Sequence, residues 1–112
     1  MVDRVTDSLE KYMDVLSARQ KLVASNIANV DTPGYHTKDL DFQSEFASHL
    51  NGGSTGGGKE VSGLKVKNDG NNVDLDRETR LLSENSIRFS AAENLIKGQF
   101  RILKTAIHEG QA

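Results

Sequence analysis

This sequence of 112 residues contains neither cysteine nor tryptophan. Without cysteine the chain has no disulfide, no thiolate metal site and no cysteine nucleophile. Aromatic residues make up 5% and hydrophobic residues 36% of the chain, which is thin material for an independent core. A chain of this length forms one small domain at most. We therefore expect no large, dry pocket in which an enzyme could shift the pKa of a catalytic group.

An excess of one charge is also lacking, because 14 basic and 16 acidic residues give a net charge of −2. This balance argues against a nucleic-acid partner, and without a polybasic cluster we expect no direct lipid binding. No apolar run reaches membrane-spanning length. Charged residues between Asp3 and Asp14 leave no hydrophobic region of a signal peptide. Taken alone, these absences predict a cytoplasmic protein, unless export uses a route that reads no cleaved signal.

Proline occurs once, at Pro33, where the first amphipathic stretch ends. Proline lacks an amide donor and disfavours helical backbone in the residue before it. Gly34 takes a positive φ at little cost, so a tight turn is expected there. A helix end followed by such a turn is common in proteins. The segment concerned consists of Ser25, Asn26, Ile27, Ala28, Asn29, Val30, Asp31, Thr32, Pro33, Gly34 and Tyr35.

Apolar residues before this turn recur at alternating steps of four and three. Such spacing predicts a helix over about residues 5–30 with a heptad seam, in which Gln20 is a polar position. Asp3 or Thr6 is the expected N-cap. The first part of the chain is thus residues 1–35, helix and turn, and its seam residues are Leu9, Met13, Leu16, Val23 and Ile27.

A second long helix is predicted over about residues 74–108, within a last part of the chain that comprises residues 74–112. Acidic residues come early in it and basic residues late, which suits the helix macrodipole. Its heptad row is Leu75, Leu82, Phe89, Ile96 and Leu103, flanked by further apolar residues. We expect the two helices to pair as an antiparallel coiled coil. Two helices alone leave the flanking apolar residues exposed, which indicates a chain that needs neighbours.

The middle of the chain, residues 36–73, has a different character. Phe42, Phe46 and Leu50 are spaced by four and predict a short amphipathic helix capped by Asp39 or Asp41. Residues 51–58 are rich in glycine and are expected to form a flexible linker. Weak alternation over residues 61–67 suggests a strand. The predicted fold is therefore mainly α, with a short, flexible and partly extended middle segment.

One stretch imitates a phosphate-binding loop. Residues 53–59 fit the pattern G-x-x-x-x-G-K, but Glu60 stands where Ser or Thr would bind magnesium. A carboxylate there would repel the phosphates, so we do not expect nucleotide binding. His36, His49 and His108 are scattered, and the acidic residues near the first two are typical of a solvated helix start. We predict no catalytic residue, no metal site, no cofactor and no enzymatic activity.

The amino-acid sequence of Ser25–Tyr35 is nevertheless distinctive. Ser-Asn-Ile-Ala-Asn-x-x-Thr-x-Gly-Tyr resembles the N-terminal signature of the bacterial flagellar axial proteins, which form the rod, the hook and the hook-associated parts. Residues 71–78 (Asn-Asn-Val-Asp-Leu-Asp-Arg-Glu) resemble the segment that opens the C-terminal helix of the proximal rod subunit in that family. Arg19, Gln20 and Leu22 are also similar. The resemblance touches both ends and covers about two thirds of the chain.

The resemblance implies a structural subunit of the flagellar basal-body rod, which polymerises through its terminal helices into a hollow drive shaft. It implies that Ser25–Tyr35 contact other subunits. The implied partners are copies of the chain, other rod subunits, the MS ring with its rod adaptor and, during secretion, the flagellar type III export apparatus. The implied location is the rod in the periplasmic space, reached without a cleaved signal peptide.

Three other interpretations remain open. Within the family, the chain could be the neighbouring rod subunit, although residues 71–78 favour the proximal one. Outside it, a cytosolic coiled-coil adaptor or secretion chaperone would also be small, acidic and helical, but would stay in the cell as a discrete dimer. A small nucleotide-binding module is the third, and Glu60 argues against it.

Overall fold

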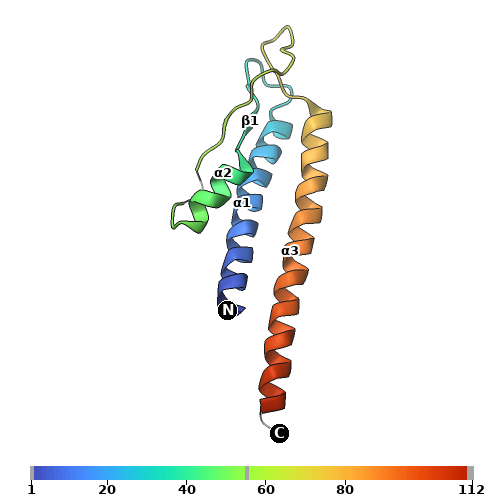
Figure 1. Ribbon diagram of the computed structural model, residues 1–112. Helices are drawn as coiled ribbons and strands as arrows, with labels where there is room; N and C mark the ends of the chain where they lie inside the picture. Colours follow the sequence, from blue (N-terminus) through green and yellow to red (C-terminus); the bar gives the residue numbers. More distant parts are fainter. Residues whose placement is uncertain (1, 55, 111–112) are drawn as a thin grey trace.

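The computed structural model describes residues 2–54 and 56–110. It contains α1 (Val2–Ala28), β1 (Lys38–Asp39), α2 (Phe42–Leu50), β2 (Lys59–Glu60) and α3 (Leu75–Gly110). α1 and α3 lie side by side and run in opposite directions, and α3 continues beyond the start of α1 (Figure 1). The predicted fold class is confirmed: two long antiparallel helices enclose a short middle region.

The helix limits lie close to the predicted ones, but the predicted N-cap of the first helix is wrong. α1 already begins at Val2, so Asp3 and Thr6 lie inside it. α3 begins where predicted, because Asp74 caps it: the Asp74 carboxylate accepts hydrogen bonds from the amides of Asp76 (3.0 Å) and Arg77 (3.3 Å). None of the helices in the described ranges is long and apolar enough to cross a membrane.

The row of α3 that faces α1 is not the predicted one. In α3 the buried residues are Glu78, Leu81, Asn85 and Ala92. The predicted row instead leaves Leu75, Leu82 and Leu103 exposed at 47%, 36% and 39%, with Phe89 and Ile96 half-buried. Two polar contacts set this rotation of α3: Asn85 donates to Gln20 (3.2 Å), and Asn26 donates to Glu78.

On α1, the predicted seam is largely in place. Leu16 and Val23 are buried to 1% exposure, while Leu9, Met13 and Ile27 are half-buried. Val15 is also fully buried, on the neighbouring face of α1. α1 is therefore covered on two sides, because α3 and the middle region both pack against it.

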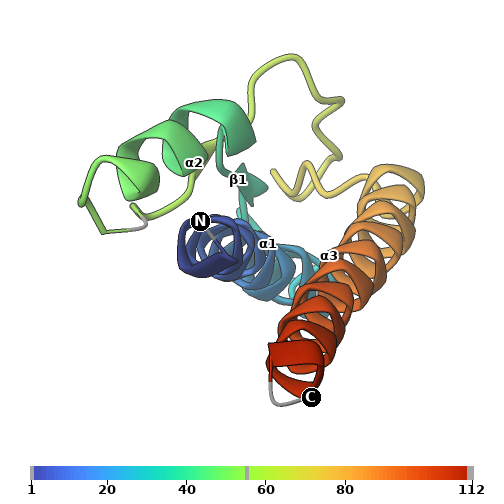
Figure 2. The same cartoon turned by 60° about the horizontal axis from the view of Figure 1, so that its bottom comes forward.

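α2 confirms the predicted short helix, and Asp41 rather than Asp39 is its N-cap. Phe42 and Phe46 pack edge-on against Tyr12 of α1, with ring centroids 5.1 and 5.6 Å away. Figure 2, which views the helices more nearly end-on, shows α2 beside α1, and Arg88 of α3 lies over the Phe42 ring, 5.9 Å from its centroid. One side of the α1–α3 pair is thus covered by α2, and the opposite side is not.

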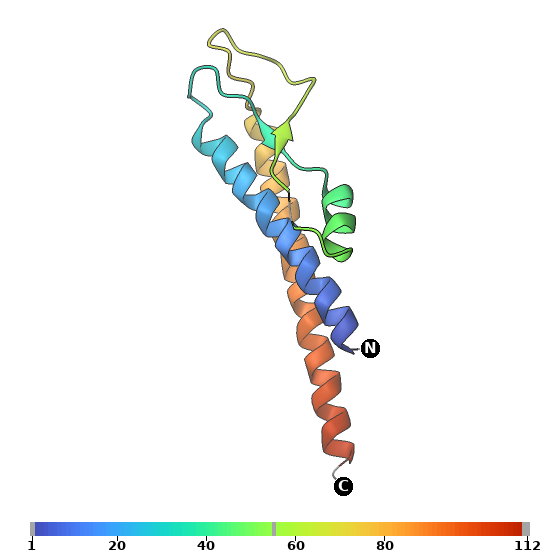
Figure 3. The same ribbon diagram turned by 90° about the vertical axis from the view of Figure 1, so that its left-hand side faces the viewer.

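The strand predicted over residues 61–67 is wrong: the extended pairing comes just before it. β2 pairs antiparallel with β1, Lys38 opposite Glu60 and Asp39 opposite Lys59. Val61 adds one more backbone bond, to Thr37 (3.0 Å). Figure 3 shows this small strand pair lying over α1. A local alternation of apolar residues did not identify the strand, because its partner lies about twenty residues earlier in the chain.

The described residues of the glycine-rich tract contact both α1 and α2. The carbonyl of Gly53 lies 2.8 Å from Nδ1 of His49, and the amide of Gly56 donates to Glu45 (2.6 Å). A Cβ at Gly58 would lie 2.8 Å from Leu22. A side chain at Gly58 would force Leu22 to move, because the backbone passes directly over that leucine. The predicted flexibility of the tract stays a prediction.

Candidate functional site

The two segments that the sequence singled out, residues 25–35 and 71–78, meet at one end of the helix pair. The side-chain amide of Asn71 donates to the carbonyls of Asn29 and Thr32, both at 2.8 Å. The amide of Gly34 donates to the carbonyl of Asp69 (2.9 Å). We call this junction, together with Asn26 and the ion-paired residues Arg19, Asp39, Arg77 and Glu78, the clasp.

Asn71 bonds to both segments of this junction. Its side chain is fully buried, and its Oδ1 accepts from the amide of Val73 (2.8 Å). Nearby, Gly34 and Gly70 both have positive φ, 75° and 87°. A Cβ at Gly70 would lie only 3.3 Å from the Cα of Gly34. The two turns therefore approach backbone to backbone, which side chains would prevent.

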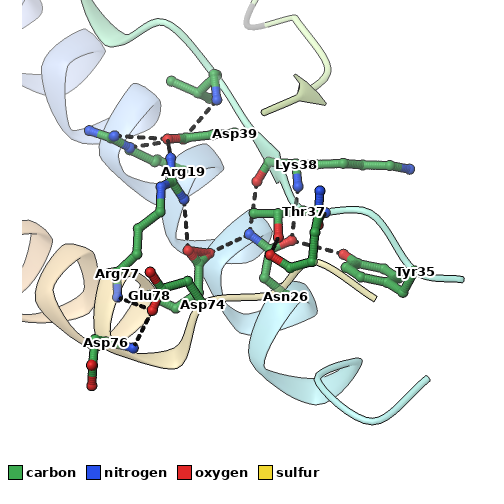
Figure 4. A network of polar contacts seen from close by, with 12 residues as sticks. Arg19, Asn26, Tyr35, Thr37, Lys38, Asp39, Asp74, Asp76, Arg77 and Glu78 are labelled. Carbon is green, nitrogen blue, oxygen red and sulfur yellow. Dashed lines mark hydrogen bonds and ion pairs between the residues drawn. The ribbon is translucent and has the colours of Figure 1, made fainter. Parts of the chain in front are cut away.

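Asn26, near the end of α1, is the centre of the clasp (Figure 4). Its side chain has 0% exposure. Its Oδ1 accepts from the Tyr35 hydroxyl (2.9 Å) and the Lys38 amide (3.1 Å). Its Nδ2 donates to the Lys38 carbonyl (2.8 Å) and to the carboxylate of Glu78. One amide group thus satisfies four partners from the turn, β1 and α3.

Four charged side chains extend this centre in an alternating row. Glu78, also at 0% exposure, accepts from Arg77 (2.7 Å), whose other nitrogen donates to Asp39 (2.6 Å). Arg19 of α1 donates two hydrogen bonds to the Asp39 carboxylate, of 3.0 and 2.9 Å. The row links α1, β1 and α3, and its two positive and two negative charges balance (Figure 4). Such balance is what makes buried charge tolerable.

The pKa values in this row follow from its geometry. Burial alone would raise the pKa of Asp39, but hydrogen bonds from Arg19, the Leu40 amide and Arg77 outweigh it and hold this pKa below its usual range. Burial would likewise lower the pKa of Arg77, but Glu78 and Asp39 raise it. Both groups therefore stay ionised at neutral pH, and each depends on the other.

The eleven signature residues divide between the two sides of the turn. Asn26 is buried, while Ile27, Asn29, Val30 and Tyr35 are half-buried. The others form an exposed rim: Ser25, Ala28, Asp31, Thr32, Pro33 and Gly34. The buried members hold the clasp together. Contact with other subunits stays a prediction, and within the signature the exposed rim is the part available for it.

Sequence reasoning missed the role of Asp39, which it offered as a helix cap. Arg19 and the pair Arg77–Glu78 were noticed only as part of a resemblance, without a structural role. The only available signal was general: charges that are buried together must balance in sign. Nothing local in the sequence shows that Arg19 pairs with a residue twenty positions later.

The contacts of the clasp are structural. The side-chain oxygens of Asn26, Asp39 and Glu78 and the amide nitrogen of Asn26 all bond to protein groups that hold segments together. Among the described residues there is no group of three or more His, Asp or Glu placed to hold a metal ion. Lys59 of the phosphate-loop pattern lies in β2, and the next helix begins only at Leu75. A phosphate-binding loop must lead directly into a helix.

The long antiparallel helix pair, closed at one end by the signature turn, belongs to a class that the sequence comparisons identify: the flagellar basal-body rod proteins. The family model described as "Flagella basal body rod protein" matches residues 13–36, which include the whole signature.

Relatives narrow the class further. The chain is 35% identical to the flagellar basal body rod protein FlgB of Borrelia hermsii, covering 90% of this chain and 93% of that protein. It is 30% identical to FlgB of Bacillus subtilis, covering 93% of both chains. It is 29% identical to FlgB of Salmonella typhimurium over 98% of this chain. The chain belongs to the FlgB family of flagellar rod proteins, a family of structural proteins.

Proposed function

We propose that this protein is a subunit of the proximal rod of the bacterial flagellum. Copies of it polymerise through their terminal helices into part of a hollow shaft, which transmits torque and leaves a path for exported subunits. The observation that carries this proposal is the clasp, because both of its segments are those that resemble rod proteins and they are bonded to each other. The relatives named above are themselves called flagellar basal body rod proteins.

The apolar surface of α3 supports assembly. Every residue from Arg101 to Gly110 is exposed, including Ile102, Leu103 and Ile107. Soluble monomers rarely leave such residues in a contiguous group. A rod subunit buries them against neighbouring helices, and we assign the exposed Leu82 to the same purpose.

The proposal includes a set of partners and a route. The partners are copies of this chain, the other rod subunits, and the MS ring with its rod adaptor. The flagellar type III apparatus exports the chain without cleavage of a signal, and the rod lies in the periplasmic space. Neither nucleic acid nor lipid is part of the proposed function.

The second candidate is a cytosolic coiled-coil adaptor or secretion chaperone, which the exposed apolar helix would also suit. The two functions differ in where the protein ends up and in what its loss does. Electron microscopy of purified basal bodies carrying a tagged subunit, together with a deletion strain, separates them. Label at the base of the rod, and rodless, non-motile cells in the deletion, are the expected results. Soluble protein in the cytoplasm beside normal basal bodies would support the adaptor instead.

A further inference from the structure

The last turns of α3 carry two stripes side by side. Phe100, Leu103 and Ile107 follow at steps of three and four, and are 55%, 39% and 53% exposed. Because this spacing repeats along one helix face, they form an apolar stripe. Beside it runs a basic stripe with the same kind of spacing, consisting of Lys97, Arg101, Lys104 and His108. The end of α3 continues past the start of α1 (Figures 1 and 3). We call residues 97–110, which carry both stripes, the overhang.

A groove lies elsewhere on the same molecule, on the α1–α3 face that α2 leaves uncovered. Its volume is about 520 Å³. Leu16 and Phe89 give it an apolar floor, and the Gln20–Asn85 bond crosses it. The small side chains at its edge let a helix approach closely. Its lining consists of Leu16, Ser17, Gln20, Lys21, Asn85, Ser86, Phe89 and Ser90. We call it the open groove.

The α1 edge of the open groove continues into an acidic stripe. Asp7, Glu10 and Asp14 precede Ser17 at steps of three and four, so they lie on the same face of α1. All three are exposed; Asp7 and Asp14 keep 60% and 62% side-chain exposure, although each makes one ion pair. Lys21 is the one basic side chain in the lining, at the end of the groove away from this stripe.

We infer that the overhang of one copy docks in the open groove of a second copy. Its apolar stripe covers the half-buried Phe89 above Leu16, and its basic stripe lies against the acidic stripe of α1. This is the helix-in-groove mode of recognition. Because the two surfaces differ, the contact is heterologous and leaves a free overhang and a free groove on each pair, which propagates a polymer.

Charge decides against the other occupants. Two overhangs facing each other would bring together like charges, Arg101 and Lys104 on both sides. A second groove, between α1, α2 and α3, is lined by Arg88 and by no acidic side chain, whereas the open groove continues into the acidic stripe. The overhang cannot reach its own groove, because Ile107 lies eighteen residues beyond Phe89, or about 27 Å along a rigid helix.

The inference rests on the proposed rod function for its setting, and the test separates the two. The chain has no cysteine of its own, so introduced thiols are the only ones. Ser17→Cys combined with Ile107→Cys, oxidised in cells and analysed in purified basal bodies, should give a ladder of covalent multimers. Two controls replace one partner: Thr105→Cys, on the opposite face of the overhang, and Ala91→Cys, in the groove lined by Arg88. Neither should give a ladder.

Each outcome has one meaning. Subunit present in basal bodies with no ladder from Ser17 and Ile107, or with a ladder only from a control pair, overturns the docking inference and leaves the rod function intact. Subunit absent from basal bodies, wild type included, overturns the rod function itself. In that case the same oxidation of the purified, concentrated chain decides the docking inference by the same ladder.

A charge swap gives a second, independent test. Arg101→Glu with Lys104→Glu should lower the yield of the Ser17–Ile107 cross-link about tenfold, as expected for two or three lost surface pairs. Adding Asp7→Lys and Glu10→Lys should restore it, because the charges are then complementary again. A yield unchanged by the first pair, or not restored by the second, contradicts the proposed register of the stripes.

Discussion

At the clasp, polar side chains from α1, β1 and α3 are buried and bonded within one chain, whereas at the overhang ten consecutive residues of α3 are exposed. The clasp uses charge and amide groups where a core is expected, and the overhang carries apolar groups where a surface is expected. The first arrangement fixes the internal geometry of the subunit without needing a neighbour. In the proposed rod, another chain covers the second. One end of the molecule therefore specifies its shape, and the proposal assigns association to the other.

The largest effect on the stability of the single chain is expected from Asn26→Ala. The change leaves Glu78 buried with one partner fewer and removes partners from both backbone groups of Lys38. We expect the free energy of unfolding to fall by about 3 kcal/mol, measured by urea denaturation. Asn94→Ala, on the exposed face of α3, is the matched control and should change it by less than about 0.5 kcal/mol. Equal effects of the two changes would show that the clasp does not stabilise the chain.

Asp39→Asn tests the charged row and its pH dependence. Arg19 and Arg77 would lose their shared carboxylate, and we expect a loss of about 2 kcal/mol at pH 7. Since the folded-state pKa of Asp39 lies below the usual value for an aspartate, its contribution is fully present above that usual pKa and disappears as the pH falls through the folded-state pKa. The variant should therefore lose less stability than the wild type below about pH 4. Parallel curves of stability against pH would contradict this.

Gly58→Ala should have a smaller effect. The new Cβ would lie 2.8 Å from Leu22, whose side chain can move only at the expense of its packing. We expect a loss of about 1 kcal/mol. Gly57→Ala is the control, because its Cβ would meet no atom within 4 Å. If both changes are neutral by thermal denaturation, the glycine-rich tract behaves as the simple linker that its composition predicts.

The sequence predicted what depends on local chemistry. Helix spacing gave α1, α2 and α3 to within a few residues, and Asp41 and Pro33 marked a start and a stop. It did not predict the rotation of α3. Leucine at every seventh position predicted one row, but the bonds from Asn85 to Gln20 and from Asn26 to Glu78 turn another row towards α1.

The clasp was half predictable for the same reason. Its two segments stood out because they resemble rod proteins, and the first also contains the turn that Pro33 and Gly34 predict. Their mutual contact was not predictable, since Asn71 bonds to carbonyls about forty residues away. The same applies to Asp39, whose partners come from both long helices. Side chains that join distant segments leave no periodic signal in the sequence.

The overhang should show the opposite behaviour to the clasp. Leu103→Ser with Ile107→Ser removes apolar groups that are already exposed, so the free energy of unfolding of the single chain should change by less than about 0.5 kcal/mol. Rod assembly should nevertheless fail, because these groups are buried only between chains. Swimming motility and recovery of the subunit in basal bodies measure this, with Thr105→Ser on the opposite face as the control. A variant that assembles normally would mean that the exposed end of α3 has no part in association, and the contrast between the two ends would then lie in stability alone.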